Sequence, residues 1–203
     1  MKDNLTPKQK HTQSRKEMVY REAIRLFVVH GYDETTIKMI SEASGVSVGS
    51  IYHFYENKSA ILAQYARNYL DTDAVSLLAE PTEANLRNPV DAIVDYYVKV
   101  SKQFEWIGVD LARKISDQYD GMWVNENGTY SNYYLPPNLL AFVERAQGFG
   151  SLAASTPAAE IVVDLQTGCS GVLFLWITTG GQFSLSQRLD TFLRRILQYY
   201  LPK

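Results

Sequence analysis

Two short helices joined by a tight turn limit the fold of this chain more than any other feature of its sequence. In ETTIKMISEASGVSVGSIYHFYENK, residues 34–58, Thr35 and Thr36 can cap the first helix, and Gly45 stands where a left-handed residue ends one. Ser47 can cap the second helix after a turn of about three residues. Caps at this spacing predict a helix-turn-helix.

The second helix of this pair has an unusual outward face. Ile51 and Tyr55 lie four residues apart and can pack against the neighbouring helices. The residues left on the outside are Val48, Gly49, Ser50, Tyr52 and His53. Glycine within a helix costs about 1 kcal/mol relative to alanine, so Gly49 indicates close approach of another molecule rather than packing. Small residues followed by hydrogen-bonding side chains suit a helix that enters a nucleic-acid groove.

The charges around this motif also favour a polyanionic partner. Asn57 can cap the following helix and so places Lys58 in its first turn, where a bound anion such as phosphate would offset the unfavourable helix dipole. Between Met1 and Arg25 the chain has seven bases and three acids, a net charge of +4. The whole chain carries −2, so the rest carries −2 − 4 = −6. A solvated, frayed N-terminus is the alternative explanation of the basic segment.

The rest of the chain has a helical pattern. A helix over Arg15–His30, with an apolar stripe at Val19, Ala23, Leu26 and Phe27, precedes the pair and ends at Gly31. Further helices are expected over residues 58–78, 90–104, 106–119 and 136–147 and in two long C-terminal segments. Residues 120–134 break the pattern, because they are rich in Asn and Gly.

The N-terminal segment resembles the DNA-binding domain of the tetracycline-repressor (TetR) family of bacterial transcription regulators. The resemblance runs through REAIRLFVVHGYDETTIKMISEASGVSVGSIYHFYENKSAIL, residues 21–62. It implies an all-α fold of about nine helices, with a three-helix helix-turn-helix DNA-binding domain over residues 1–57 and an effector-binding and dimerisation domain over residues 58–203. The implied function is that of a repressor that a small, mostly apolar or aromatic effector releases from a near-palindromic operator in double-stranded DNA.

The resemblance also implies roles for single residues. The expected DNA-binding residues are Thr36, Ser47, Val48, Gly49, Ser50, Tyr52, His53 and Lys58, the middle ones at base edges and the others mainly at phosphates. The helix that begins at Lys58 is expected to carry the effector's signal to the DNA-binding domain. One departure from the family is the order Phe54-Tyr55, which leaves open whether the Tyr55 hydroxyl is buried or reaches the backbone.

The two C-terminal segments have apolar stripes wider than one small core requires. We expect a homodimer built on a twofold four-helix bundle, as in the resembled family, whose two heads enter successive major grooves about 34 Å apart. The expected interface residues are Leu165, Val172, Leu173, Trp176, Leu189, Phe192, Leu193 and Ile196. Packing within a single chain is the alternative. The run Leu165–Trp176 is expected to form a deeply buried helix in which Cys169 is a packed thiol.

An effector site is expected between the head and the bundle. Its candidate residues are Tyr69, Tyr97, Gln103, Phe104, Tyr119, Trp123, Phe142 and Gln166, which combine aromatic rings with two amides. Aromatic residues at helical spacing are more often plain core, so this set is a pool from which a site would be drawn.

Catalysis is not expected of this chain. His11, His30 and His53 lack the spacing of metal ligands, and the sequence has no Gly-rich phosphate loop, nucleophile elbow or paired-carboxylate motif. We therefore expect no enzyme activity, no metal and no cofactor. The N-terminus lacks a secretory signal, which predicts a cytoplasmic protein without a membrane partner. An all-helical interaction adaptor that does not bind DNA is the alternative function, and the effector, operator and regulated genes stay open.

Overall fold

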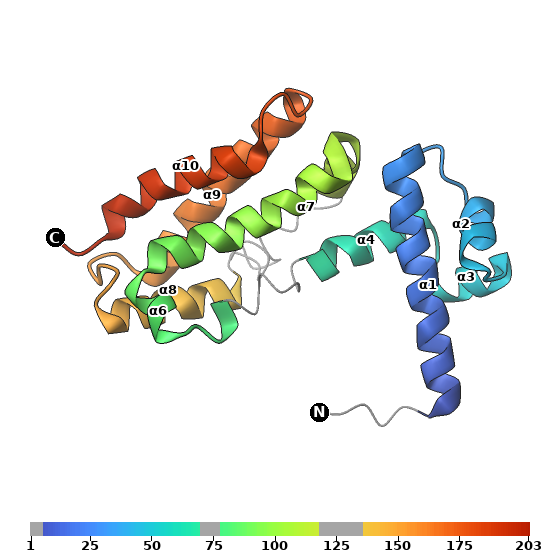
Figure 1. Cartoon of the computed structure of the whole chain (residues 1–203), viewed down its shortest axis with the longest axis horizontal. Coiled ribbons are helices and arrows are strands. Elements are labelled where there is room, and N and C mark those ends of the chain that lie inside the picture. Colours follow the sequence, from blue (N-terminus) through green and yellow to red (C-terminus); the bar gives the residue numbers. More distant parts are fainter. Residues whose placement is uncertain (1–5, 70–77, 118–135) are drawn as a thin grey trace, which may run out of the picture. The chain divides into compact units, whose positions relative to one another are not determined.

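The computed structural model of the protein describes residues 6–69, 78–117 and 136–203 (Figure 1). Within these ranges the regular secondary structure is helical, with nine α-helices and one 3-10 helix, which confirms the predicted all-α fold. The chain divides into two compact units, Met1–Arg67 and Asn68–Lys203. The predicted boundary after residue 57 concerns the division of function and stays a prediction.

The N-terminal unit contains α1 (Pro7–His30), α2 (Ile37–Ser44), α3 (Val48–Phe54) and most of α4 (Lys58–Tyr69). The first helix begins eight residues before the predicted start, at Pro7. Thr6 and Gln9 form a capping box there, and Pro7 in the first turn has a backbone angle suited to a helix. The apolar stripe of α1 ends at Gly31, as predicted.

The predicted helix-turn-helix is confirmed within this unit. The Thr36 hydroxyl accepts a hydrogen bond from the Met39 N–H at 3.2 Å, and Gly45 follows α2 at a φ of +67°, where a side chain would be strained. Ser47 caps α3 in the same way. Thr35 is a core residue rather than a cap: it is fully buried, and its hydroxyl donates to the carbonyl oxygens of Leu26 and Gly31 at 3.2 and 2.8 Å.

The C-terminal unit contains α6 (Glu83–Arg87), α7 (Pro89–Asp117), α8 (Pro137–Phe149), α9 (Ala158–Thr178), α10 (Leu185–Leu197) and the short helix η1 (Gln198–Tyr200). α10 packs along α7 and α9, and α8 packs on α9 (Figure 1). The two helices predicted over residues 90–104 and 106–119 form one kinked segment, α7. Its break lies at Gly108, whose φ of +79° only glycine adopts without strain. Residues 70–77 of the predicted long fourth helix, and residues 120–134, lie outside the described part.

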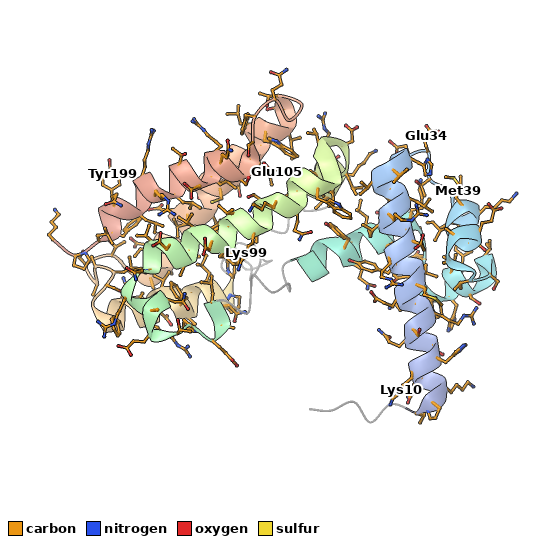
Figure 2. All side chains as sticks on the ribbon, in the orientation of Figure 1. Lys10, Glu34, Met39, Lys99, Glu105 and Tyr199 are labelled. Carbon is orange, nitrogen blue, oxygen red and sulfur yellow. The ribbon has the colours of Figure 1, made fainter. Side chains whose placement is uncertain are left out.

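Glu105, labelled in Figure 2, joins α7 to the start of α10. Its Oε1 accepts hydrogen bonds from the Ser184 hydroxyl and the Ser186 N–H at 2.9 and 3.0 Å, and its Oε2 accepts one from the Ser186 hydroxyl at 3.0 Å. Partial burial favours a higher pKa for Glu105, but these donors stabilise the carboxylate more strongly, and the pKa is lowered. The ionised carboxylate therefore holds two of the helices that surround the cavity described below.

α9 is the only helix of the described ranges that is long and apolar enough to pass for a membrane span. Leu165, Cys169 and Trp176 are buried, but Phe174 and Leu175 are 68% and 47% exposed. The expectation of a deeply buried helix is therefore wrong for one side of α9. The other side faces α8 and α10, as a core helix of a water-soluble protein does, and such helices meet the same length and hydropathy test.

Candidate nucleic-acid interface and ligand cavity

The exposed face of α3 is formed by four of the predicted DNA-binding residues. Val48 and Tyr52 are 39% and 55% exposed, and Gly49 and His53 are exposed beside them. A Cβ added at Gly49 would meet no atom within 4 Å, so the fold itself does not require glycine there. Close approach of another molecule at Gly49 stays a prediction, with which this open space agrees.

Ser50 lies at the flank of this face and is half-buried. Its Oγ lies 2.9 Å from the Ser47 Oγ and accepts a hydrogen bond at 3.3 Å from Arg15 of α1. Arg15 was not among the predicted site residues, because the contact joins positions 35 residues apart in the sequence. Its basic character was visible only as part of the N-terminal charge excess.

Thr36 and Lys58 stand at helix N-termini on either side of the motif. Thr36 is exposed and caps α2. Lys58 Nζ donates to the carbonyl oxygens of Tyr32 and Asp33 at 2.7 and 3.3 Å, and it lies 4.6 Å from the centroid of the Tyr32 ring. Its place in the first turn of α4 therefore has an explanation that requires no bound anion. A phosphate contact by Lys58 stays a prediction.

The open question about Tyr55 is answered by the structure. Tyr55 is 4% exposed, and burial, with the nearby Glu17 and Tyr20, raises its pKa to about 12. Lys16 of α1 lies over the ring, with Nζ at 5.2 Å from its centroid. Tyr55 is a core residue that holds α3 against α1.

A cavity of about 480 Å³ lies within the C-terminal unit, between α7, α9 and α10. Its apolar wall includes Val100, Phe104, Leu173, Ile177, Leu185 and Leu189. Tyr97 and Gln166 cross it from α7 to α9, with the Tyr97 hydroxyl donating to the Gln166 Oε1 at 2.8 Å. Arg113 and Asp117, one helical turn apart, contribute opposite charges to its lining. Its size and mixture of groups suit a small organic molecule.

Three of the predicted effector residues line this cavity, namely Tyr97, Phe104 and Gln166. Two others do not: Gln103 is exposed on α7, and Phe142 is fully buried in α8. The structure does not describe the side chain of Tyr69 or residues Tyr119 and Trp123. Sequence reasoning missed the lining residues Arg113 and Leu185. Helical periodicity marks Arg113 only as polar surface and Leu185 only as apolar core.

The structure corrects part of the predicted dimer interface. Leu165, Trp176, Leu189 and Leu193 are at most 4% exposed and pack inside the protomer, so they offer no surface to a second copy. Val172, Leu173, Phe192 and Ile196 are half-buried. The Phe192 ring lies against Gly168, where an added Cβ would come within 2.1 Å of it, so this close helix contact is also internal.

Cys169 is buried in the wall of the cavity, and burial raises the pKa of its thiol. A protonated thiol is a poor nucleophile, which agrees with the predicted packed cysteine. Among the described residues, no group of three His, Cys, Asp or Glu side chains is placed to hold a metal ion.

These features define a class of protein: an all-helical chain with a helix-turn-helix unit at one end and a cavity-bearing helical unit at the other. The pattern of the bacterial regulatory proteins of the tetR family matches residues 19–65. The segment that carries the helix-turn-helix is thus similar to the DNA-binding part of this family.

Individual relatives share modest identity with the chain. The HTH-type transcriptional repressor Rv1474c of Mycobacterium tuberculosis is 27% identical over 54% of this chain and 56% of its own length. The HTH-type transcriptional repressor AcnR of Corynebacterium glutamicum is 25% identical over 89% of this chain and 91% of its own. The chain spans only about half the length of two of the curated relatives that it matches.

Solved structures share the fold. SmeT is the repressor of the Stenotrophomonas maltophilia multidrug efflux pump SmeDEF, and one of its structures is a complex with triclosan. That structure has a TM-score of 0.64 and 16% identity, over 94% of this chain and 93% of its own. At this identity the likeness shows the fold alone.

The contacts of Lys58 predict a measurable role in stability. Lys58→Ala removes charged hydrogen bonds and a cation–π contact, so we expect a loss of about 1–2 kcal/mol in the free energy of unfolding. Urea denaturation measures this loss. Lys38→Ala is the control, because Lys38 is exposed and its ion pair with Glu42 is long, at 3.9 Å. This substitution should lower the free energy of unfolding by less than about 0.5 kcal/mol. Equal small losses in both variants would contradict the stabilising role.

Proposed function

We propose that the protein is a transcriptional repressor that binds a near-palindromic operator through α3 and is released from it by a small effector in the cavity. The observation that carries this proposal is the exposed face of α3. Gly49 has open space there, and Val48, Tyr52 and His53 are exposed on a helix whose opposite side is buried. The names of the two relatives, both repressors, support the direction of control. A DNA-binding repressor acts in the cytoplasm, which is the location that we propose.

The proposed roles differ along the recognition surface. Val48, Gly49 and Ser50 stand at the start of α3, where a helix in the major groove approaches base edges. Tyr52, His53, Thr36 and Lys58 are proposed to position the domain through phosphates. Ser47, which caps α3, is proposed to contact DNA beside them.

Binding to selected DNA tests this proposal. We expect the protein to enrich one sequence from a random duplex pool, with an affinity that falls steeply between 50 and 200 mM salt. Tyr52→Ala should weaken binding to all sequences alike, whereas Val48→Ala should change the enriched sequence, with a discrimination change of about 1–3 kcal/mol per base pair. Fluorescence anisotropy and sequencing of the enriched pool measure both. Failure to bind any duplex would favour an interaction adaptor.

The cavity is the proposed effector site. Its apolar wall and the nearly balanced charges of Arg113 and Asp117 favour a neutral, apolar or aromatic molecule over a highly charged one. The SmeT complex with triclosan shows that a relative of this fold binds an aromatic compound. An effector can lower DNA affinity only by the ratio of its affinities for the two conformations, with α4 proposed as the transmitting helix.

Filling the cavity tests its role. Leu173→Trp places a larger side chain in the lining and should abolish binding of the neutral fluorescent dye N-phenyl-1-naphthylamine while leaving operator affinity within about twofold. Glu144→Trp, on the exposed side of α8, adds the same bulk elsewhere and should bind the dye normally. Dye fluorescence and operator anisotropy measure the two properties. Equal dye binding by both variants would place the site outside the cavity. If the dye bound to the wild-type protein without lowering its operator affinity, release by this ligand would be contradicted.

The exposed side of α9 is the proposed dimer surface. Gly171, Phe174 and Leu175 are exposed there at helical spacing, an arrangement that a single protomer leaves uncovered. Glu160 lies at one end of α9, and Arg188 of α10 lines a shallow hollow together with Leu175 near the other end, so an antiparallel twofold arrangement of two α9 helices brings unlike charges together. A second copy of the chain is therefore the proposed occupant.

A charge placed on this surface should separate the protomers. Leu175→Arg is expected to convert a dimer to a monomer in sedimentation equilibrium, because a buried unpaired charge costs several kcal/mol. Trp106→Arg changes an apolar residue of α7 that is 56% exposed and should leave the dimer intact. A wild-type protein that sediments as a monomer at all concentrations, or a dimeric Leu175→Arg, would overturn the proposed interface.

A further inference from the structure

The cations of the N-terminal unit are distributed unevenly around the recognition helix. Phosphate contacts by Lys and Arg supply most of the affinity of DNA-binding proteins, yet α3 has neither residue. Of the bases elsewhere in this unit, Arg25 is paired with Glu22 at 2.8 Å, Lys38 lies near Glu42, and Lys58 is held by backbone carbonyls. The other bases of this unit whose side chains are described all lie on α1.

The first turns of α1 form a basic overhang, defined here as Pro7–Lys16. They contain four bases and no acidic residue, and residues 7–14 are all exposed. Figure 1 shows this end of α1 extending beyond α2 and α3. A capping box and Pro7 hold the overhang in helical form although its first two turns are exposed.

One side of the overhang continues the core stripe of α1. Helical spacing of three and four residues leads back from the buried Val19 to Arg15, Thr12 and Lys8. The same side meets α3, because Arg15 donates to Ser50 and the adjacent Lys16 lies over Tyr55. Lys8 therefore lies on the same side of α1 as Arg15, about 10 Å away along the axis of α1. This distance equals about three base-pair steps of DNA. Lys10 is on the opposite side of the helix (Figure 2).

We propose that the Lys8, Thr12 and Arg15 side of the overhang is a second DNA-contact surface, which binds phosphates beside the groove that α3 enters. The inference rests on the proposed function and adds to it the source of sequence-independent affinity. Arg15 has two roles in this arrangement: its guanidinium orients the Ser50 hydroxyl and presents its remaining donors to the backbone of the DNA. The partner is double-stranded DNA, recognised by charge rather than by base sequence.

Lys8→Ala and Lys10→Ala form a matched pair of variants, since both remove one exposed lysine from the same helix. The probe is the duplex that the wild-type protein enriches from a random pool, and anisotropy between 50 and 200 mM NaCl gives the slope of log K against log salt. Lys8→Ala should reduce this slope by about 0.9, which corresponds to a roughly 3.5-fold smaller loss of affinity over that range. Lys10→Ala should leave the slope unchanged, and both variants should enrich the same sequence.

The possible outcomes separate this inference from the proposed function. Wild-type binding with equal slopes for Lys8→Ala, Lys10→Ala and wild type would overturn the second surface and leave the repressor proposal standing. Equal reductions in both variants would show a diffuse field instead of a contact side and would also overturn it. An altered enriched sequence for Lys8→Ala would show base reading and contradict the phosphate role. If the wild-type protein enriched no duplex, the proposed function would fail, and this inference with it. Circular dichroism checks that both variants keep the helix content of the wild type.

Discussion

The recognition surface depends on the burial of Ile51. This side chain is fully buried, together with Ile40 of α2 and Val46 of the turn, and it fixes the rotation of α3 about its own axis. Successive residues of a helix point about 100° apart, so burial of Ile51 sends Gly49, Tyr52 and His53 to the outside. Removing its methyl groups would cost several kcal/mol and would also release the orientation on which DNA reading depends.

The caps make this arrangement possible within very short helices. α2 has eight residues and α3 has seven, lengths at which isolated helices are marginal in water. Thr36 and Ser47 satisfy backbone N–H groups that two such helices would otherwise leave unpaired. Gly45 lets the chain reverse between them without strain. Packing against α1 then supplies the stability that local propensity does not.

In the C-terminal unit, the cavity and the proposed dimer surface meet on α9, because Phe174 both lines the cavity and is 68% exposed. α9 turns Leu165 and Trp176 inward and presents Phe174 and Leu175 outward. The Tyr97–Gln166 hydrogen bond and the contacts of Glu105 hold α7 to its neighbours around the cavity. A molecule bound there would therefore touch the helix that also carries the proposed subunit contact. This shared helix would give the proposed effector a physical route to the proposed dimer.

Local patterns predicted the helix-turn-helix closely, because caps, a positive-φ glycine and a short apolar stripe are all encoded within about 25 residues. They predicted less of α1, whose basic first turns lack an apolar stripe, and they divided α7 at the wrong residue. Of the effector pool, Tyr97, Phe104 and Gln166 line the cavity, while Phe142 is core. Periodicity shows that a face is apolar but does not show which element covers it.

The sequence by itself determined the helical class, the helix-turn-helix and the outward face of α3, since these depend on residue spacing along a single segment. Tertiary structure alone decided that Lys58 is bound by the carbonyls of Tyr32 and Asp33, and that Arg15 meets Ser50. It also decided which apolar residues of α9 stay exposed. These facts depend on contacts between distant segments, because the role of a cation or an apolar side chain is set by what the fold places next to it.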